Sequence, residues 1–480
     1  MTPPSPGSLA TAPALQMALD RSARASLTEQ ISRALRAAIV EGRLAPGARL
    51  PSWRDLASQL GVARGTVRAA YESLIDAQLI VPLGAAGTFV GRQVAPALAA
   101  PAAEPAALLR DPVADYPRST TGVFQMGVPA QDAFPAKVWA RTVTRAARAS
   151  AAAPLRYPDP RGDDALRTAI AAYLTVARGV ACSPAQVFVT SGYTAAITLA
   201  VHALGLRGDA WCEDPGYPLT RRTLAALGMA CVPVAVDAQG LDVAAGMAAA
   251  PQAALAVVTP GQQAPLGVTL SAERRQALLG WAARSGAWVL EDDYLGELQL
   301  AGRAVPALAA QDAAGRVLHL GTFSKTINPS LRLGFLVVPA AQVARFDAAA
   351  ALFGSAPAPL LQHAVAEFLH GGHLLRHLRR MKRLYAQRRD AVMACLQAAS
   401  VTCRATGLSV LVRLPPGTPD VALALAVRPH GLAPVPLSPW YARPGPQHAG
   451  LLLGVANVPE HEAAAYCLQL MDLAARYPAG

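Results

Sequence analysis

A lysine flanked by hydroxyl side chains and followed by an arginine is the part of this sequence with the clearest chemistry. Residues 321–339, GTFSKTINPSLRLGFLVVP, contain Lys325, one of only three lysines in 480 residues. A primary amine can lose its proton and form an imine with a carbonyl, which the permanently charged guanidinium of arginine cannot do. Thr322, Ser324 and Arg332 add donors suited to a phosphate monoester. The pattern therefore predicts a ligand that carries both a phosphate monoester and a carbonyl able to react with the Lys325 amine. The alternative is that Lys325 is an ordinary surface lysine.

Two other polar clusters follow strand-like runs. In VFVTSGYT, a strand over 187–190 leads into Ser191 and Gly192, where a helix begins. The free N–H groups of a helix N-terminus can hold a phosphate. In CEDPGYP, Tyr217 lies in a turn after a strand, and its ring could stack on a flat cofactor or pack against the protein. Neither pattern is specific when taken alone.

The run WVLEDDYLGE brings carboxylates to the end of a buried strand. Asp292 lies between Glu291 and Asp293, and Tyr294 follows them. Such a cluster can bind a metal ion or cap a helix. The cluster by itself leaves these interpretations open.

A sheet is needed to bring these clusters together. Strand and helix signals alternate over the last 360 or so residues, which is typical of an α/β domain. Open α/β sheets build their ligand sites at the carboxyl ends of strands. A run of Ala and Pro over about 95–112 predicts a semi-stiff linker in front of this domain.

Composition limits the remaining classes of function. Pro, Gly, Gln or Arg interrupts every apolar run before the roughly 18 residues of a membrane span, and the N-terminus lacks a signal-peptide pattern. We therefore expect a cytoplasmic protein. The six cysteines show no CxxC and no Cys/His ligand spacing, which predicts buried thiols and no metal site. A formal net charge of +12 favours a polyanionic partner.

Residues 21–92 form a small basic segment. Apolar residues at every fourth position over 27–39 predict one helix, Ser52 predicts the capped start of a second, and a third begins near Arg64 with Arg68 on its polar face. Two short strands around a glycine-containing turn follow, so the segment is predicted to be a winged helix-turn-helix. Ten arginines against five acidic residues give it a net charge of +5. The alternative is a helical bundle whose arginines only keep it soluble.

The stretch GRLAPGARLPSWRDLASQLGVARGTVRAAYESL, within about Leu27–Val90, resembles the GntR superfamily. The resemblance implies binding to double-stranded DNA, with the third helix in the major groove. Two positions depart from the pattern: Ala63 replaces a Ser that would cap this helix, and the wing LGAAGT lacks the usual Arg or Ser. The implied DNA contacts are Arg54, Arg64, Thr66 and Arg68.

From about Phe124 onward, FQMGVPAQDAFPAKVWAR, RYPDPRGDDALRTAIAAYL and the polar clusters together resemble the fold-type I aminotransferases that use pyridoxal 5'-phosphate (PLP). The resemblance implies that Lys325 forms an aldimine with PLP and that Asp292 pairs with the pyridine nitrogen. Tyr294 would hydrogen-bond the phenolic oxygen, and Tyr217 would stack on the ring. The implied phosphate ligands are Tyr193, Thr194, Thr322, Ser324 and Arg332, together with Tyr157 of a neighbouring subunit, which implies a homodimer.

A GntR-type segment joined to such a domain resembles the MocR/GabR family of transcriptional regulators. The expected organisation is a disordered tail (1–20), a winged helix-turn-helix (21–92), an Ala/Pro linker (93–118) and an effector domain (119–480). The expected fold of the effector domain is α/β, with a mostly parallel sheet, flanking helices and a small C-terminal subdomain. PLP and an amine or amino acid are the expected ligands, besides promoter DNA.

Several departures from the aminotransferase pattern bear on function. Leu452 in GLLLGVA stands where aminotransferases commonly carry an arginine that clamps the substrate carboxylate, and Arg221 or Arg222 could replace it. Regulators of the PdxR type also lack this arginine and respond to PLP. We therefore expect ligand sensing, with PLP as the first effector and an amine as the second. The alternative is an active aminotransferase that carries a DNA-binding segment. TPGQQAPLG departs further from the family pattern at Gln262, Ala264 and Leu266.

Overall fold

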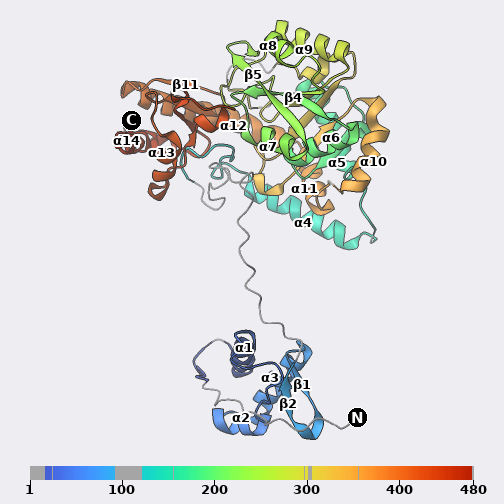
Figure 1. Cartoon of the computed structure of the whole chain (residues 1–480), viewed down its shortest axis with the longest axis vertical. Helices are drawn as coiled ribbons and strands as arrows, with labels where there is room; N and C mark the ends of the chain where they lie inside the picture. Colours follow the sequence, from blue (N-terminus) through green and yellow to red (C-terminus); the bar gives the residue numbers. More distant parts are fainter. Residues whose placement is uncertain are drawn as a thin grey trace, which may run out of the picture. The chain divides into compact units, whose positions relative to one another are not determined.

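The computed structural model describes residues 17–91 and 122–477, apart from residues 24, 155, 297, 301–304 and 355. The chain divides into two compact units, Met1–Arg110 and Asp111–Gly480, each described here by itself (Figure 1). The predicted linker and most of the predicted N-terminal tail lie outside the described residues. In the part of the chain that is described, no helix is long and apolar enough to cross a membrane.

The smaller unit is a winged helix-turn-helix, as predicted. It contains α1 (Leu27–Val40), α2 (Trp53–Leu60), α3 (Arg64–Asp76) and an antiparallel hairpin of β1 (Ile80–Pro82) and β2 (Thr88–Val90). The Ser26 and Ser52 side chains accept main-chain hydrogen bonds at the starts of α1 and α2, a type of cap worth about 1 kcal/mol. Apolar side chains from all three helices and the hairpin form one core.

The larger unit is built on an eight-stranded sheet in the order β3-β10-β9-β8-β7-β4-β5-β6. Its strands are β3 (Val187–Thr190), β4 (Gly208–Asp214), β5 (Met229–Asp237), β6 (Gly240–Leu241), β7 (Leu255–Val258), β8 (Trp288–Asp292), β9 (Val317–Thr322) and β10 (Gly334–Val337). Strands β9, β8, β7, β4 and β5 run parallel, whereas β10 runs antiparallel to β3 and β9. The carboxyl ends of β3, β4, β8 and β9 therefore meet at one edge of the sheet.

Helices cover both faces of this sheet. One face is packed by α5 (Asp164–Arg178), α11 (Pro359–His370) and the first half of α12 (His373–Ala398). The other face is packed by α6 (Tyr193–Leu204) and α10 (Val343–Phe353). Helices α8 (Val243–Ala249) and α9 (Ala272–Ser285) pack against the residues of β4, β7 and β8 that point away from α6 and α10. Helix α7 (Pro218–Ala226) lies against β5, and α4 (Ala136–Ala152) lies along α11 (Figure 1).

A C-terminal subdomain completes the larger unit. An antiparallel sheet in the order β11-β12-β14-β13 packs on the second half of α12, α13 (Asp420–Ala426) and α14 (Ala463–Ala474). The strands are β11 (Cys403–Ala405), β12 (Ser409–Arg413), β13 (Val435–Pro436) and β14 (Gly450–Gly454). The predicted fold class is therefore confirmed: a mostly parallel sheet with flanking helices and a small C-terminal subdomain.

Candidate functional site

A cavity of about 600 Å³ opens at the edge where the strand ends of the larger unit meet. The four polar clusters singled out in the sequence, which are up to about 140 residues apart, all contribute to its wall. Nine of the ten predicted cofactor residues line it: Tyr193, Thr194, Tyr217, Asp292, Tyr294, Thr322, Ser324, Lys325 and Arg332. The structure thus brings them together, and the contact of each with a cofactor stays a prediction.

Asp292, the last residue of β8, presents a buried carboxylate to this cavity. Its Oδ1 has no hydrogen-bond partner among the described residues. Burial and the nearby carboxylates of Asp293 and Glu213 together raise the pKa of Asp292 to about 8, although the charge of Lys325 opposes the increase. A buried acceptor that is destabilised as an anion is suited to a cationic partner. A protonated pyridine nitrogen would supply that partner, so this wall of the cavity fits PLP.

The other two carboxylates of the β8 cluster have different partners. Glu291 accepts hydrogen bonds from the main-chain N–H groups of Leu308 and Ala309, at 2.5 and 3.0 Å, and lies 2.9 Å from His319 Nδ1. Asp293 forms a buried ion pair with Arg178, Oδ2 to Nε 2.6 Å. The described residues contain no group of three or more His, Cys, Asp or Glu side chains that could hold a metal ion. Only Asp292 is therefore left to face a ligand.

Lys325 follows β9 and points its amine toward the same cavity. Its Nζ donates a hydrogen bond to the Gly127 carbonyl oxygen at 3.2 Å. Burial lowers the pKa of Lys325, although the charge of Asp292 opposes this. A lowered pKa increases the neutral, nucleophilic fraction of the amine near neutral pH. Gly127 has a φ of 78°, which favours glycine, and a Cβ at this position would lie 2.6 Å from Nζ and would displace the amine.

The predicted phosphate ligands converge from two directions. Helix α6 begins immediately after Gly192, whose φ of 95° favours glycine. Thr322 is the last residue of β9 and Ser324 lies in the turn that follows, where Ser324 N donates to Thr322 Oγ1 at 3.1 Å. Arg332 has a φ of 49°, and its guanidinium lies next to Gly192. A helix N-terminus, two hydroxyls and a guanidinium facing one cavity can hold a dianionic phosphate.

Three aromatic side chains that pack against one another form another part of the cavity wall. Tyr217 immediately precedes α7, and its ring packs edge-on against Tyr193 at 5.7 Å and tilted against Trp440 at 5.8 Å. The Tyr193 hydroxyl hydrogen-bonds Thr220 Oγ1 at 2.6 Å. Burial raises the pKa of Tyr294, and the charge of Asp292 adds to this, so Tyr294 remains a hydroxyl donor. The cavity wall thus offers aromatic surface to a flat ring and hydroxyl groups to the polar substituents of that ring.

A buried acid behind the cavity was not identified from the sequence. Glu213, at the end of β4, accepts hydrogen bonds from Thr259 N at 2.9 Å, Thr259 Oγ1 at 2.5 Å and Gln263 Nε2 at 3.3 Å. Burial raises the pKa of Glu213 to about 7, and these hydrogen bonds oppose the increase. Glu213 fixes the loop after β7 to β4. The sequence feature that could have identified Glu213 is its position in CEDPGYP, at the end of a strand and four residues before Tyr217.

Arg221 and Arg222, which could replace the substrate-binding arginine that is absent at Leu452, have different surroundings. Arg221 donates to four main-chain carbonyl oxygens, those of Gly216, Pro439, Trp440 and Tyr441, so it holds the C-terminal subdomain against α7. Arg222 lines the cavity, and so does Arg428, which the sequence did not single out. Leu452 is fully buried in β14 and packs against Leu411, Leu437 and Trp440.

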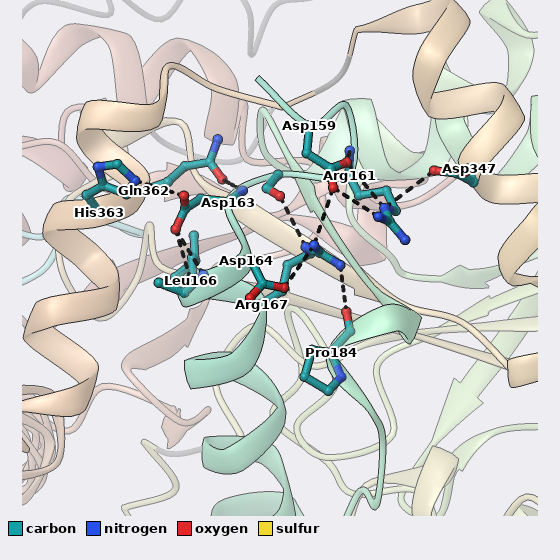
Figure 2. Close-up of polar contacts among 12 residues, drawn as sticks. Asp159, Arg161, Asp163, Asp164, Leu166, Arg167, Pro184, Asp347, Gln362 and His363 are labelled. Atoms are coloured by element: carbon teal, nitrogen blue, oxygen red, sulfur yellow. Dashed lines mark hydrogen bonds and ion pairs between the residues drawn. The ribbon is translucent and has the colours of Figure 1, made fainter. Parts of the chain in front are cut away.

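Tyr157 is the predicted cofactor residue that lies outside the cavity. Its side chain is 99% exposed, in the loop between α4 and α5. A polar network holds the chain that follows it (Figure 2). Arg161 pairs with Asp159 at 3.0 Å and with Asp347 at 3.4 Å, and Asp163 binds His363 at 2.8 Å. A large aromatic side chain is thus presented to solvent by a well-anchored loop.

The predicted DNA contacts lie around the start of α3. Arg54, Arg64 and Arg68 are exposed, and Thr66 is half-buried. The Arg54 guanidinium lies 4.8 Å from the Trp53 ring centroid, and Arg68 Nε lies 3.5 Å from Glu72 Oε1. Ala63 provides no side-chain cap for α3, as expected. Arg64 and Arg68 therefore lie in the first two turns of a helix that has no side-chain cap, which favours contact with phosphates and base edges.

Comparison with known proteins agrees with both parts of the structure. The family model for bacterial regulatory proteins of the gntR family matches residues 27–90, and that for aminotransferase class I and II matches residues 124–445. The chain is 35% identical to the probable rhizopine catabolism regulatory protein MocR of Rhizobium meliloti, over 92% of both chains. It is 32% identical to the pyridoxine biosynthesis transcriptional regulator PdxR of Corynebacterium glutamicum, over 80% of this chain and 81% of PdxR.

Solved structures resemble the larger unit. An archaeal alanine:glyoxylate aminotransferase superposes with a TM-score of 0.68 at 23% identity, covering 77% of this chain and 95% of its own. The α-aminoadipate aminotransferase LysN of Thermus thermophilus, solved with N-(5'-phosphopyridoxyl)-L-leucine, gives 0.66 at 24% identity, with the same two coverages. At these identities the likeness shows the fold.

Proposed function

This chain belongs to the MocR-type regulators of the GntR family, and we propose that its larger domain senses PLP and reports it to the winged helix. It is a transcriptional regulator, and PLP is the cofactor of its aminotransferase-type domain. When bound, PLP supplies an aldehyde that reacts with amines and a ring that accepts electrons. The observation that carries the proposal is the buried Oδ1 of Asp292, which has no partner in the described part of the chain and lies in the same cavity as the amine of Lys325.

The chain's own residues have separate tasks in this proposal. Lys325 provides the attachment point, and the Gly127 carbonyl oxygen orients its amine. Arg332 and the N-terminus of α6 neutralise the phosphate, while Tyr217 covers the ring face. Asp292 keeps the ring nitrogen protonated. Because PdxR is named as a regulator of pyridoxine biosynthesis, the relatives favour PLP itself as the first effector.

The cavity also favours a second ligand with an acidic group. Among the described residues that line it, Asp292 is the only carboxylate, whereas Arg222 and Arg428 add positive charge beyond Lys325 and Arg332. We propose that an amino compound with a carboxylate or sulfonate is the second effector. The buried Leu452 cannot clamp that group, which favours sensing over ordinary transamination.

We further propose that the site is completed in a homodimer. Tyr157 is 99% exposed on the loop between α4 and α5, so its ring is available for contact with a second chain. In a dimer it would reach the phosphate end of the neighbouring cavity. Sedimentation equilibrium should give twice the chain mass for the wild type. Tyr157→Ala should weaken PLP binding more than Tyr157→Phe, because the phenylalanine variant retains the packing, and a monomeric wild type would contradict the proposal.

Titration of DNA affinity with PLP tests the sensing function. We expect PLP to change the affinity of the cofactor-free protein for its operator by roughly 5- to 150-fold, the range of typical coupling energies. A PLP analogue that lacks the aldehyde serves as the matched control. Propylamine and β-alanine, added to the PLP-loaded protein, then separate amine from amino acid, and only β-alanine should act. A protein that ignores PLP but responds strongly to β-alanine would contradict the order of effectors.

A further inference from the structure

Helix α4 carries an uninterrupted stripe of positive charge. Lys137, Arg141, Arg145 and Arg148 follow one another at intervals of four, four and three residues, so they share one face of the helix. All four side chains are exposed. The helix contains no acidic residue, and its opposite side, which includes Thr142 and Ala146, is buried. The stripe spans roughly 16 Å at 1.5 Å per residue.

Helix α12 carries a second stripe of the same kind. Arg376, Arg379, Arg380 and Arg383 have the i, i+3, i+4, i+7 spacing of a single helix face, and all are exposed. The first acidic residue of this 26-residue helix is Asp390. The buried face of α12 holds the core of the larger unit, so this arginine-rich face is its outer side.

The start of α12 lies close to α4, with α11 between them. Trp139 of α4 packs against Phe368 of α11 with ring centroids 5.6 Å apart, and Phe368 packs against His373 at the start of α12, also at 5.6 Å. Burial lowers the pKa of His373, and Arg376 of α12 together with Arg141 and Arg145 of α4 lowers it further. Arg141, Arg145 and Arg376 therefore act on one point. We call the eight cations of the two stripes the α4–α12 basic surface.

Very little negative charge compensates this surface. Among the described residues, the only carboxylate ion pair made by the eight cations is that of Arg145 with Glu367, Nη1 to Oε1 2.7 Å. The winged helix accounts for +5 of the formal +12, so more than half of the excess charge lies elsewhere in the chain. Solvation alone does not require such segregation, because surface helices usually alternate both signs of charge. The cavity and the DNA contacts of α3 use none of these eight residues.

We propose that the α4–α12 basic surface binds the phosphate backbone of duplex DNA, as a second contact beyond the winged helix. Duplex DNA carries one negative charge per roughly 1.7 Å of its axis, so a stripe of this length faces several phosphates. Exposed arginines spaced along a helix contact phosphates without reading sequence. The inference goes beyond the sensing function and rests only on the protein being a DNA-binding regulator. It gives the larger domain a direct hold on the DNA that flanks the operator.

The slope of DNA affinity against salt measures this contact. The quadruple variant Arg141→Gln, Arg148→Gln, Arg379→Gln, Arg380→Gln removes four cations that have no carboxylate partner in the described part of the chain. Each lost phosphate contact should reduce the slope of log affinity against log salt by about 0.9, so we expect a reduction of roughly 2 to 4. The probe is a duplex of arbitrary sequence, about 60 base pairs long, because backbone contacts need no operator.

A matched variant separates this surface from general charge. Arg207→Gln, Arg345→Gln, Arg413→Gln, Arg476→Gln removes the same net charge from exposed positions on other elements. We expect it to keep the wild-type slope within about one unit. A basic-surface variant with the wild-type slope would overturn the proposal, and so would an equal loss in both variants. Neither variant alters α3 or the cavity. The salt dependence therefore tests the α4–α12 basic surface alone, whereas operator recognition and PLP absorbance test the proposed function separately.

Discussion

Lys325→Ala is expected to remove the visible absorbance that PLP gives to the wild-type protein, together with the response of DNA binding to PLP. The expected loss is essentially complete, because alanine has no nucleophile and neither of the other two lysines lines the cavity. Burial lowers the pKa of Lys325, so the wild-type amine is neutral at a lower pH than free lysine and captures the cofactor more readily near neutral pH. Absorbance spectra of both proteins, after incubation with PLP and desalting, measure the effect.

Two further variants identify the cause. Lys325→Arg keeps the positive charge beside Asp292 but lacks an amine that can form an imine, so it should lose the band as completely as alanine does. Lys382→Ala removes a lysine from α12 and should leave the spectrum unchanged. A band that persists in Lys325→Arg would mean that charge, and not the amine, retains the cofactor. The proposed attachment would then be wrong.

The parts of the site predicted from sequence share one physical basis. Residues such as Asp292, Thr322 and Ser324 follow buried strand runs, and strand ends in a parallel sheet meet at one edge whatever the intervening helices are. The winged helix was predictable for a similar reason. Capping serines and period-four apolar residues act within a few residues of each other, so the local pattern determines α1 and α2.

The parts that were not predicted depend on contacts distant in sequence. Arg428 lines the cavity from the turn after α13, and no local pattern distinguishes it from the many solvated arginines of this chain. Arg221 and Arg222 are neighbours, yet one holds main-chain carbonyls of the C-terminal subdomain and the other lines the cavity. Only the packing of α7 against that subdomain separates their tasks. The three carboxylates at the end of β8 were likewise equivalent in sequence, and their partners distinguish them.

Arg64→Ala is expected to weaken binding to the operator by roughly 5- to 150-fold, the range for the loss of one good base contact worth about 1–3 kcal/mol. Arg64 is the first residue of α3, where the helix-turn-helix geometry places side chains against base edges in the major groove. It is exposed and has no ion pair among the described residues, so its removal leaves no buried charge without a partner. Competition between operator and arbitrary duplex should also show reduced specificity.

The control for this variant is Arg36→Ala, which removes an exposed arginine from α1 and should change affinity little. The PLP spectrum should be the same in both, because the described residues that line the cavity all belong to the larger unit. Loss of a base contact at α3 lowers operator affinity more than affinity for arbitrary DNA, whereas loss of the α4–α12 basic surface lowers both. If Arg64→Ala retains full operator affinity and specificity, α3 is not the helix that reads the sequence.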